Sequence, residues 1–196
     1  MPKIVDHEKR KKQIAEATWR VILDLGMEGA SVRNIAKEAG VSLGALRHYF
    51  STQDELLVYA MKLVKEQATI RINEITMSEL PPKEKILKVL LEIVPVNEET
   101  MAEMEVWFAF TFHARHKEDI FDAQHDGIFI GMQNLIHYLD QHQLLRKDLD
   151  KEIETERLYA LVDGIALHAM LESKRVNKER IINVLTHHLD SICVEG

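Results

Sequence analysis

The chain has 196 residues, of which 46% are hydrophobic and 29% charged, and its formal net charge is −7. This composition is typical of a folded globular protein and excludes a disordered or collagen-like chain, and no apolar run approaches the roughly 18 residues that a membrane helix requires. Because the single cysteine, Cys193, excludes an intrachain disulfide and the N-terminus lacks the apolar core of a signal peptide, we expect a cytoplasmic protein.

The charge is distributed unevenly along the chain. Residues 1–50 hold nine Lys and Arg against six Asp and Glu, whereas residues 51–196 hold 16 against 26. Because residues 1–50 are mildly basic and the rest of the chain is acidic, the N-terminal segment is favoured as the part that binds a polyanionic partner. Chance clustering of so few charges remains the alternative.

Apolar residues recur at helical spacing along nearly the whole chain, and glycine and proline are scarce, which predicts an all-α protein of nine helices without strands. The first helix carries Ile14, Val21, Ile22 and Leu25 on one face and should end at Gly26. Two short helices follow over 31–39 and 42–50, and a Thr52/Glu55 capping box begins a long helix toward residue 76. The remaining helices are expected over 83–94, 97–116, 119–143 (with an interruption near 126–127), 150–173 and 177–193.

Residues 31–50 have the pattern of a helix-turn-helix. Ala36 is small enough for two helices to cross closely, and Gly40 can adopt the positive φ of a tight turn. Val41, Leu46 and Phe50 are spaced to pack the second helix against the first. The outward side chains that remain, which could enter a DNA major groove, are Ser42, Leu43, Ala45, Arg47 and Tyr49. A helical hairpin that only packs is the alternative.

The run from Ile35 to Phe50, followed by Asp54-Glu55-Leu56-Leu57, resembles the signature of the TetR family of bacterial repressors. The stretches 107–110 and 161–167 resemble its BetI-like branch. The resemblance implies a three-helix helix-turn-helix DNA-binding domain over 1–52 and a larger helical ligand-binding and dimerisation domain over 53–196. It further implies a homodimer that binds palindromic double-stranded DNA and is released by a small-molecule ligand.

Position by position, the resemblance implies base contacts by Arg33, Leu43, Ala45 and Arg47 and phosphate contacts by Ser31, Ser42, Tyr49 and Thr52. The chain departs from the common family pattern at Arg47, often Tyr, and at Gln53, often Lys. An Arg at position 47 could bond guanine in bidentate fashion or contact only a phosphate. The basic run 9–12 could reach the DNA backbone or the minor groove, or could simply be solvated.

Met and aromatic residues on one side of the 97–116 helix are candidates for an effector pocket. They are Met104, Trp107 and Phe108, with Phe129 and Met132 as an opposite wall. A carboxylate of Glu103 or Glu105 could add charge. The alternative is that both glutamates are simply exposed, and that the Met and aromatic side chains are ordinary core.

No metal and no cofactor other than an unidentified effector is expected, because His113/His116 and His187/His188 lack a third ligand. We expect no enzyme, since no nucleophile elbow, phosphate-binding glycine loop or catalytic carboxylate pair is present. A DNA-binding dimer without an effector is the further alternative.

Two apolar stripes are candidates for a four-helix dimer interface in which Gly164 would allow close approach. The same stripes could instead face the chain's own core. The first stripe comprises Leu158, Leu161, Val162, Ile165, His168 and Ala169, and the second Ile181, Ile182, Leu185, His188, Leu189 and Ile192.

Overall fold

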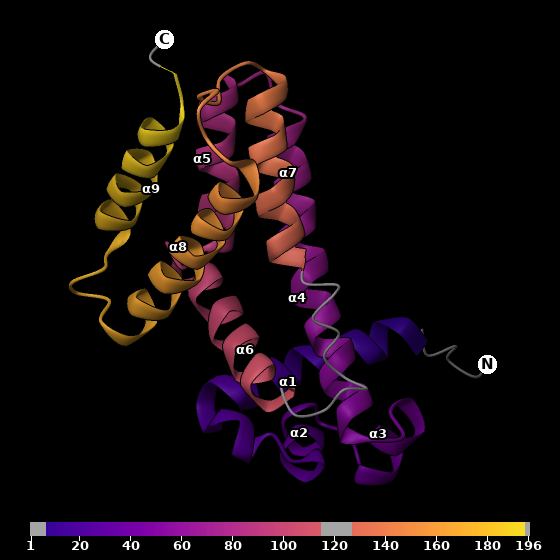
Figure 1. Cartoon of the computed structure of the whole chain (residues 1–196). Coiled ribbons are helices and arrows are strands. Elements are labelled where there is room, and N and C mark those ends of the chain that lie inside the picture. The colour runs from indigo at the N-terminus through magenta and orange to yellow at the C-terminus, as the bar shows by residue number, and fades with distance from the viewer. Residues whose placement is uncertain (1–6, 115–126, 195–196) are drawn as a thin grey trace. The chain divides into compact units, whose positions relative to one another are not determined.

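The computed structural model describes residues 7–114 and 127–194, and this part of the chain folds into nine α-helices without a strand (Figure 1). The all-α prediction is therefore confirmed, the nearest approach to a strand being one isolated bridge between Leu145 and Cys193. Among these residues, no helix is long and apolar enough to cross a membrane. The helices are α1 (His7–Gly29), α2 (Val32–Glu38), α3 (Leu43–Tyr49), α4 (Gln53–Thr76), α5 (Pro82–Ile93), α6 (Glu98–Ala114), α7 (Gly127–Gln141), α8 (Lys151–Leu171) and α9 (Lys178–Ile192).

Most helix boundaries lie within two residues of the predicted ones, because the capping side chains act as the sequence indicates. Asn97, Asp150 and Asn177 each accept a hydrogen bond from a backbone N–H in the first turn that follows. One expectation at α1 is wrong: the buried face ends at Ile22, and Leu25 is 58% exposed. Gly26 does interrupt the helix, with φ 68° and ψ 179°, but the helical turn resumes to Gly29. The expected ends near residues 116 and 119 lie outside the described residues.

The helices form two compact units. Among the described residues, the first unit contains 7–67 and 105–114, and the second contains 68–104 and 127–194. By packing, the first unit thus extends past residue 52, where the sequence placed a domain boundary. Helices α4 and α6 each have residues in both units.

The core of the first unit joins α1, α2, α3, α4 and the second half of α6. Its largest fully buried side chains include Ile14, Ile35, Leu46, Phe50 and Leu56. Trp19 packs against this core, and its indole N–H donates a hydrogen bond to the Ala60 carbonyl at 3.0 Å. Burying each such side chain contributes roughly 1.5–3 kcal/mol, so this core fixes how α2 and α3 are presented.

The core of the second unit is built from α5, α7, α8 and α9. Leu158, Val162 and Ile165 of α8 pack in it with Leu185 and Leu189 of α9. The two stripes expected at a dimer interface therefore lie mainly in the chain's own core, and the alternative interpretation is correct for them. Helical periodicity marks a buried face but does not tell which surface covers it.

Candidate nucleic-acid interface

Serine side chains fix the first turns of α2 and α3. The Ser31 hydroxyl accepts from the Asn34 N–H at 3.2 Å, and the Ser42 hydroxyl accepts from the Ala45 N–H at 3.0 Å. Both serines have extended backbones with ψ near 150°. Each such cap stabilises its helix by about 1 kcal/mol, and the hydroxyl keeps its own proton for donation to a phosphate oxygen.

The turn between α2 and α3 depends on Gly40. Its φ of 64° lies in the left-handed region, and its N–H donates to the Lys37 carbonyl at 3.2 Å. The next N–H, of Val41, donates to the Ala36 carbonyl at 3.0 Å. These two bonds form a Schellman motif, which ends α2 and redirects the chain into α3 as the sequence predicts.

One side of α3 is buried and the other is free for contact. Leu46 and the following Phe50 are each 1% exposed and pack in the core. On the opposite side Ser42, Leu43 and Arg47 are exposed, while Ala45 and Tyr49 are half-buried. Arg33 on α2 is exposed, and Ser31 is half-buried. The structure thus groups the predicted base and phosphate contacts on α2, α3 and the start of α4, and their role in DNA binding stays a prediction.

The start of α4 is anchored to the helix-turn-helix. The Thr52 hydroxyl accepts from the Glu55 N–H at 3.0 Å, and the Glu55 carboxylate accepts from the Ser51 N–H at 2.8 Å, one residue before the partner that a capping box would use. The Gln53 amide donates to the Ala30 carbonyl at 2.9 Å. Gln53, where the resemblance would lead us to expect Lys, therefore holds α4 to the chain before α2.

The first turn of α1 contacts α3, which no pattern in the sequence indicated. The ring of His7 lies 4.8 Å from that of Tyr49 and 6.2 Å from that of His48, measured between centroids. The Lys11 ammonium lies 5.4 Å from the Phe50 ring centroid, within cation–π range. From the basic run 9–12, Lys11 is therefore directed toward aromatic rings. His48, exposed beside Arg47, is an additional candidate for DNA contact that the position-wise comparison missed.

Comparison with known proteins agrees with this geometry. Residues 14–60 match the tetR family of bacterial regulatory proteins, and residues 82–194 match the C-terminal part of BetI-type transcriptional repressors. The chain belongs to the TetR family. It is 71% identical over 195 residues to the transcriptional regulator PksA of Bacillus subtilis, covering 100% of this chain and 95% of PksA. It is 31% identical to the regulator BetI of Escherichia coli K12, covering 96% of this chain and 95% of BetI.

Solved structures show the same fold. A transcriptional regulator from Rhodococcus sp. Rha1 superposes with a TM-score of 0.83 at 27% identity, covering 93% of this chain and 95% of the other. A regulator from Saccharomonospora viridis in complex with choline superposes with a TM-score of 0.81 at 19% identity, covering 96% of this chain and 100% of the other. This TetR-family chain is thus a transcriptional regulator.

The residues expected to line an effector pocket divide between the two units of the TetR-family chain. Trp107 and Phe108 belong to the first unit, where the Lys65 ammonium lies 5.1 Å from the Trp107 ring centroid. Met104, Phe129 and Met132 belong to the second, in which Met132 is fully buried core. Their common role in effector binding stays a prediction.

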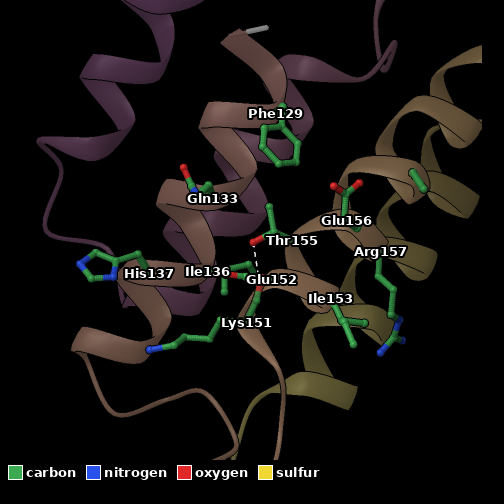
Figure 2. Close-up of a pocket in the computed structure, with 11 residues that line it drawn as sticks. Phe129, Gln133, Ile136, His137, Lys151, Glu152, Ile153, Thr155, Glu156 and Arg157 are labelled. Carbon is green, nitrogen blue, oxygen red and sulfur yellow. Dashed lines mark hydrogen bonds between the residues drawn. The ribbon is translucent and has the colours of Figure 1, made fainter. Parts of the chain in front are cut away.

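Phe129 borders a groove between α7 and α8 with a volume of about 810 Å³. Figure 2 shows Phe129 and Gln133 on α7 and Thr155 and Glu156 on α8, around one part of the groove, with His137 and Lys151 toward one end. The groove is further lined by Ile136, Glu152, Ile153, Arg157 and Ala160.

A second polar feature of this unit is centred on Arg71 of α4. Its guanidinium contacts Glu103 of α6 through two bonds of 3.0 and 2.6 Å and Glu92 of α5 at 2.7 Å, and lies 3.5 Å from Glu99. The pKa of Arg71 is raised, first by the bonds to Glu103, against burial, which lowers it, and further by Glu92. Glu103, expected to be exposed or to face an effector, is instead 12% exposed and paired.

Among the residues that the structure describes, no three His, Cys, Asp or Glu side chains come together as a metal site. His113 lies 3.9 Å from an Asp54 carboxylate oxygen, and its expected companion His116 is outside the described residues. His188 is buried, and burial, with the nearby charge of Arg157, lowers its pKa.

Proposed function

We propose that this protein is a homodimeric repressor that binds a palindromic operator through α3 of each subunit and is released by a small-molecule effector. The observation that carries the proposal is the outer face of α3, where Leu43 and Arg47 are exposed while Leu46 and Phe50 anchor the helix from behind. A short helix held this way can enter a major groove, which is wide enough to admit one α-helix.

Relatives with this fold support control by a small molecule. The Saccharomonospora viridis regulator was solved with choline. The multidrug binding protein EbrR, with a TM-score of 0.65 and 25% identity, was solved with imidazole. An effector acts if it binds one conformation better than the other, and a ~100-fold preference supplies about 2.7 kcal/mol of coupling. Helices α4 and α6 are the elements through which effector binding would act on the DNA-binding unit, since each of them has residues in both units.

The dimer needs a surface other than the stripes buried in the core. The outer side of α8 offers one: Leu171 is 69% exposed, and the partly exposed Leu167 and Gly164 lie on the same side at helical spacing. A Cβ on Gly164 would meet no atom within 4 Å, so this side is open to a second helix.

A charge on this side of α8 should oppose the dimer without disturbing the core. Leu171→Arg is therefore expected to convert dimers to monomers in light scattering, because an arginine would be buried between the two subunits. The matched control is Leu25→Arg on α1, at a leucine that is 58% exposed, and it should leave the dimer intact. A Leu171→Arg protein that stays dimeric would exclude this surface.

The experiment that tests DNA recognition is selection of binding sites from random duplex DNA at physiological salt. A palindrome whose half-sites lie about 34–36 Å apart is expected. Failure to enrich any sequence with folded, dimeric protein would refute the operator proposal.

Arg47→Ala then separates base contact from phosphate contact. If Arg47 bonds guanine, the variant loses about 1–3 kcal/mol of specific binding and its preference at one base pair. Uniform weakening across sequences would show a phosphate contact only. Arg180→Ala, which removes an exposed arginine from α9, serves as the control.

A further inference from the structure

We propose that His7 of α1 and His48 of α3, in their protonated form, together bind the phosphate backbone of one DNA strand. This inference rests on the proposed function and deepens it, since it adds α1 to the DNA-binding surface and makes operator binding depend on pH. His7 lies outside the helix-turn-helix, and it comes close to His48 only because α1 packs against α3.

Three aromatic rings meet where α1 begins and α3 ends (Figure 1). The centroid of the His7 ring lies 4.8 Å from that of Tyr49 and 6.2 Å from that of His48. The rings of His48 and Tyr49 lie 5.6 Å apart and nearly perpendicular, at 75°. Both imidazoles are therefore close enough to contact the same stretch of one DNA strand as Tyr49, for which the sequence predicted a phosphate contact.

The position of α1 beside α3 does not depend on the His7 side chain. The Tyr59 hydroxyl donates a hydrogen bond to the Glu8 carboxylate at 3.4 Å. The Lys11 ammonium lies 5.4 Å from the Phe50 ring centroid and 5.6 Å from that of Tyr59, within cation–π range. These contacts hold the start of α1 against the end of α3 and against α4. Substitutions at His7 are therefore expected to leave α1 in place.

Both imidazoles are accessible to a ligand from solvent. The His7 side chain is 52% exposed, and His48 is exposed beside Arg47. In the part of the chain that the structure describes, no hydrogen bond holds either ring, and the Glu8 carboxylate lies 3.9 Å from the His7 ring nitrogen. The two rings thus pack against Tyr49 through their faces and edges and keep ring nitrogens for an external acceptor.

The charges around the two rings favour an anion. The charged or titratable groups near them are Glu8 and Lys11 on α1, Arg47 and Tyr49 on α3, and Tyr59 on α4. Burial, followed by the charge of Glu8, raises the pKa of Tyr59, so this phenol stays neutral. One carboxylate therefore faces two permanent cations, and protonation of the histidines adds up to two more positive charges.

Histidine is the side chain whose ordinary titration falls between pH 5 and 8. An imidazolium donates a charge-assisted hydrogen bond to a phosphate oxygen, roughly twice as strong as a bond between neutral groups. The negative DNA backbone favours the protonated ring, so DNA binding takes up protons. Operator affinity should therefore be higher on the acidic side of this range and fall as pH rises through it.

The test is fluorescence anisotropy of the full-length protein with a labelled duplex of the selected operator, at about pH 6 and about pH 8. Wild-type affinity should fall roughly 10-fold or more between the two. In His7→Phe, which keeps a ring against Tyr49, and in His48→Gln, the fall should be about 3–10-fold smaller. His7→Lys, which keeps the charge, should retain tight binding at about pH 8. His142→Gln removes an exposed histidine after α7 and is the control.

The salt dependence of binding provides a second measurement. Each phosphate neutralised by a cation adds about 0.9 to the slope of log affinity against log salt concentration. His7→Phe should therefore reduce the slope by about one at pH 6 and leave it unchanged at pH 8, where the wild-type ring is neutral as well. A residue that only packs against Tyr49 would alter neither slope.

Equal pH and salt dependence of wild type and His7→Phe would overturn the inference, and so would a His48→Gln protein with the wild-type pH profile. A duplex of unselected sequence is measured in parallel, because a phosphate contact requires no particular base. If an operator is selected and His7→Phe changes nothing, the phosphate inference fails alone. If no sequence is enriched, the proposed function fails, and the unselected duplex still decides whether His7 contacts phosphate.

Discussion

Replacing Arg71 by Met should destabilise the second unit more than any exposed charge replacement. The Arg71 guanidinium contacts Glu92, Glu99 and Glu103, and it joins α4 to α5 and α6. Methionine keeps most of the side-chain volume, so the packing of the aliphatic stem is largely retained. What is lost is the positive charge, which leaves three carboxylates close together.

The size of the effect follows from burial. Removing one partner of a fully buried pair costs about 3–5 kcal/mol, whereas an exposed pair contributes about 0–1 kcal/mol. The side chains of Arg71, Glu92 and Glu103 are 24%, 26% and 12% exposed, which places this group nearer the buried limit. Glu99 is 66% exposed and adds little. We expect a loss of about 2–3 kcal/mol.

The measurement is urea unfolding followed by circular dichroism, at one protein concentration because dimerisation adds to stability. The matched control is Arg175→Met. Arg175 forms two bonds of 2.9 Å to Glu172, but the pair is 58% and 52% exposed, so its loss should destabilise the protein far less than the loss of Arg71.

Adding Glu103→Gln to Arg71→Met should restore part of the stability, because it removes the most buried of the stranded carboxylates. A loss below about 0.5 kcal/mol for Arg71→Met, or one equal to that of the control, would refute the burial argument.

Three further expectations concern His188, Cys193 and Gly40. Burial lowers the pKa of His188 below 6.5, so the folded state binds its proton more weakly than the unfolded chain does. The free energy of unfolding should therefore fall as pH drops below about 6.5, and less steeply in His188→Gln; equal pH slopes would contradict this. The Cys193 thiol is buried and its pKa is raised, so a disulfide reagent should modify it only at the rate of unfolding; rapid labelling of native protein would show otherwise. Gly40→Val should lower the free energy of unfolding by about 1–2 kcal/mol in thermal or urea unfolding, because φ at this position is 64°. The control Gly44→Ala, within α3, should not destabilise the protein. Equal effects of the two substitutions would contradict the role of the turn conformation.

Features that depend on neighbours in sequence were predicted correctly. The caps at Ser31 and Ser42, the turn at Gly40 and the anchors Leu46 and Phe50 were all identified from residues 31–50. Each works through a side chain and a backbone group only a few positions apart, so the local sequence is sufficient.

Features that depend on partners far apart in sequence were decided by the tertiary structure. Glu103 pairs with Arg71, 32 residues away, and His7 lies against Tyr49. The periodic stripe at Leu158 was evident from the sequence, but only the packing shows that α8 buries it within its own chain. A helical pattern specifies that a face is covered, whereas the identity of the covering helix depends on how all the helices pack together.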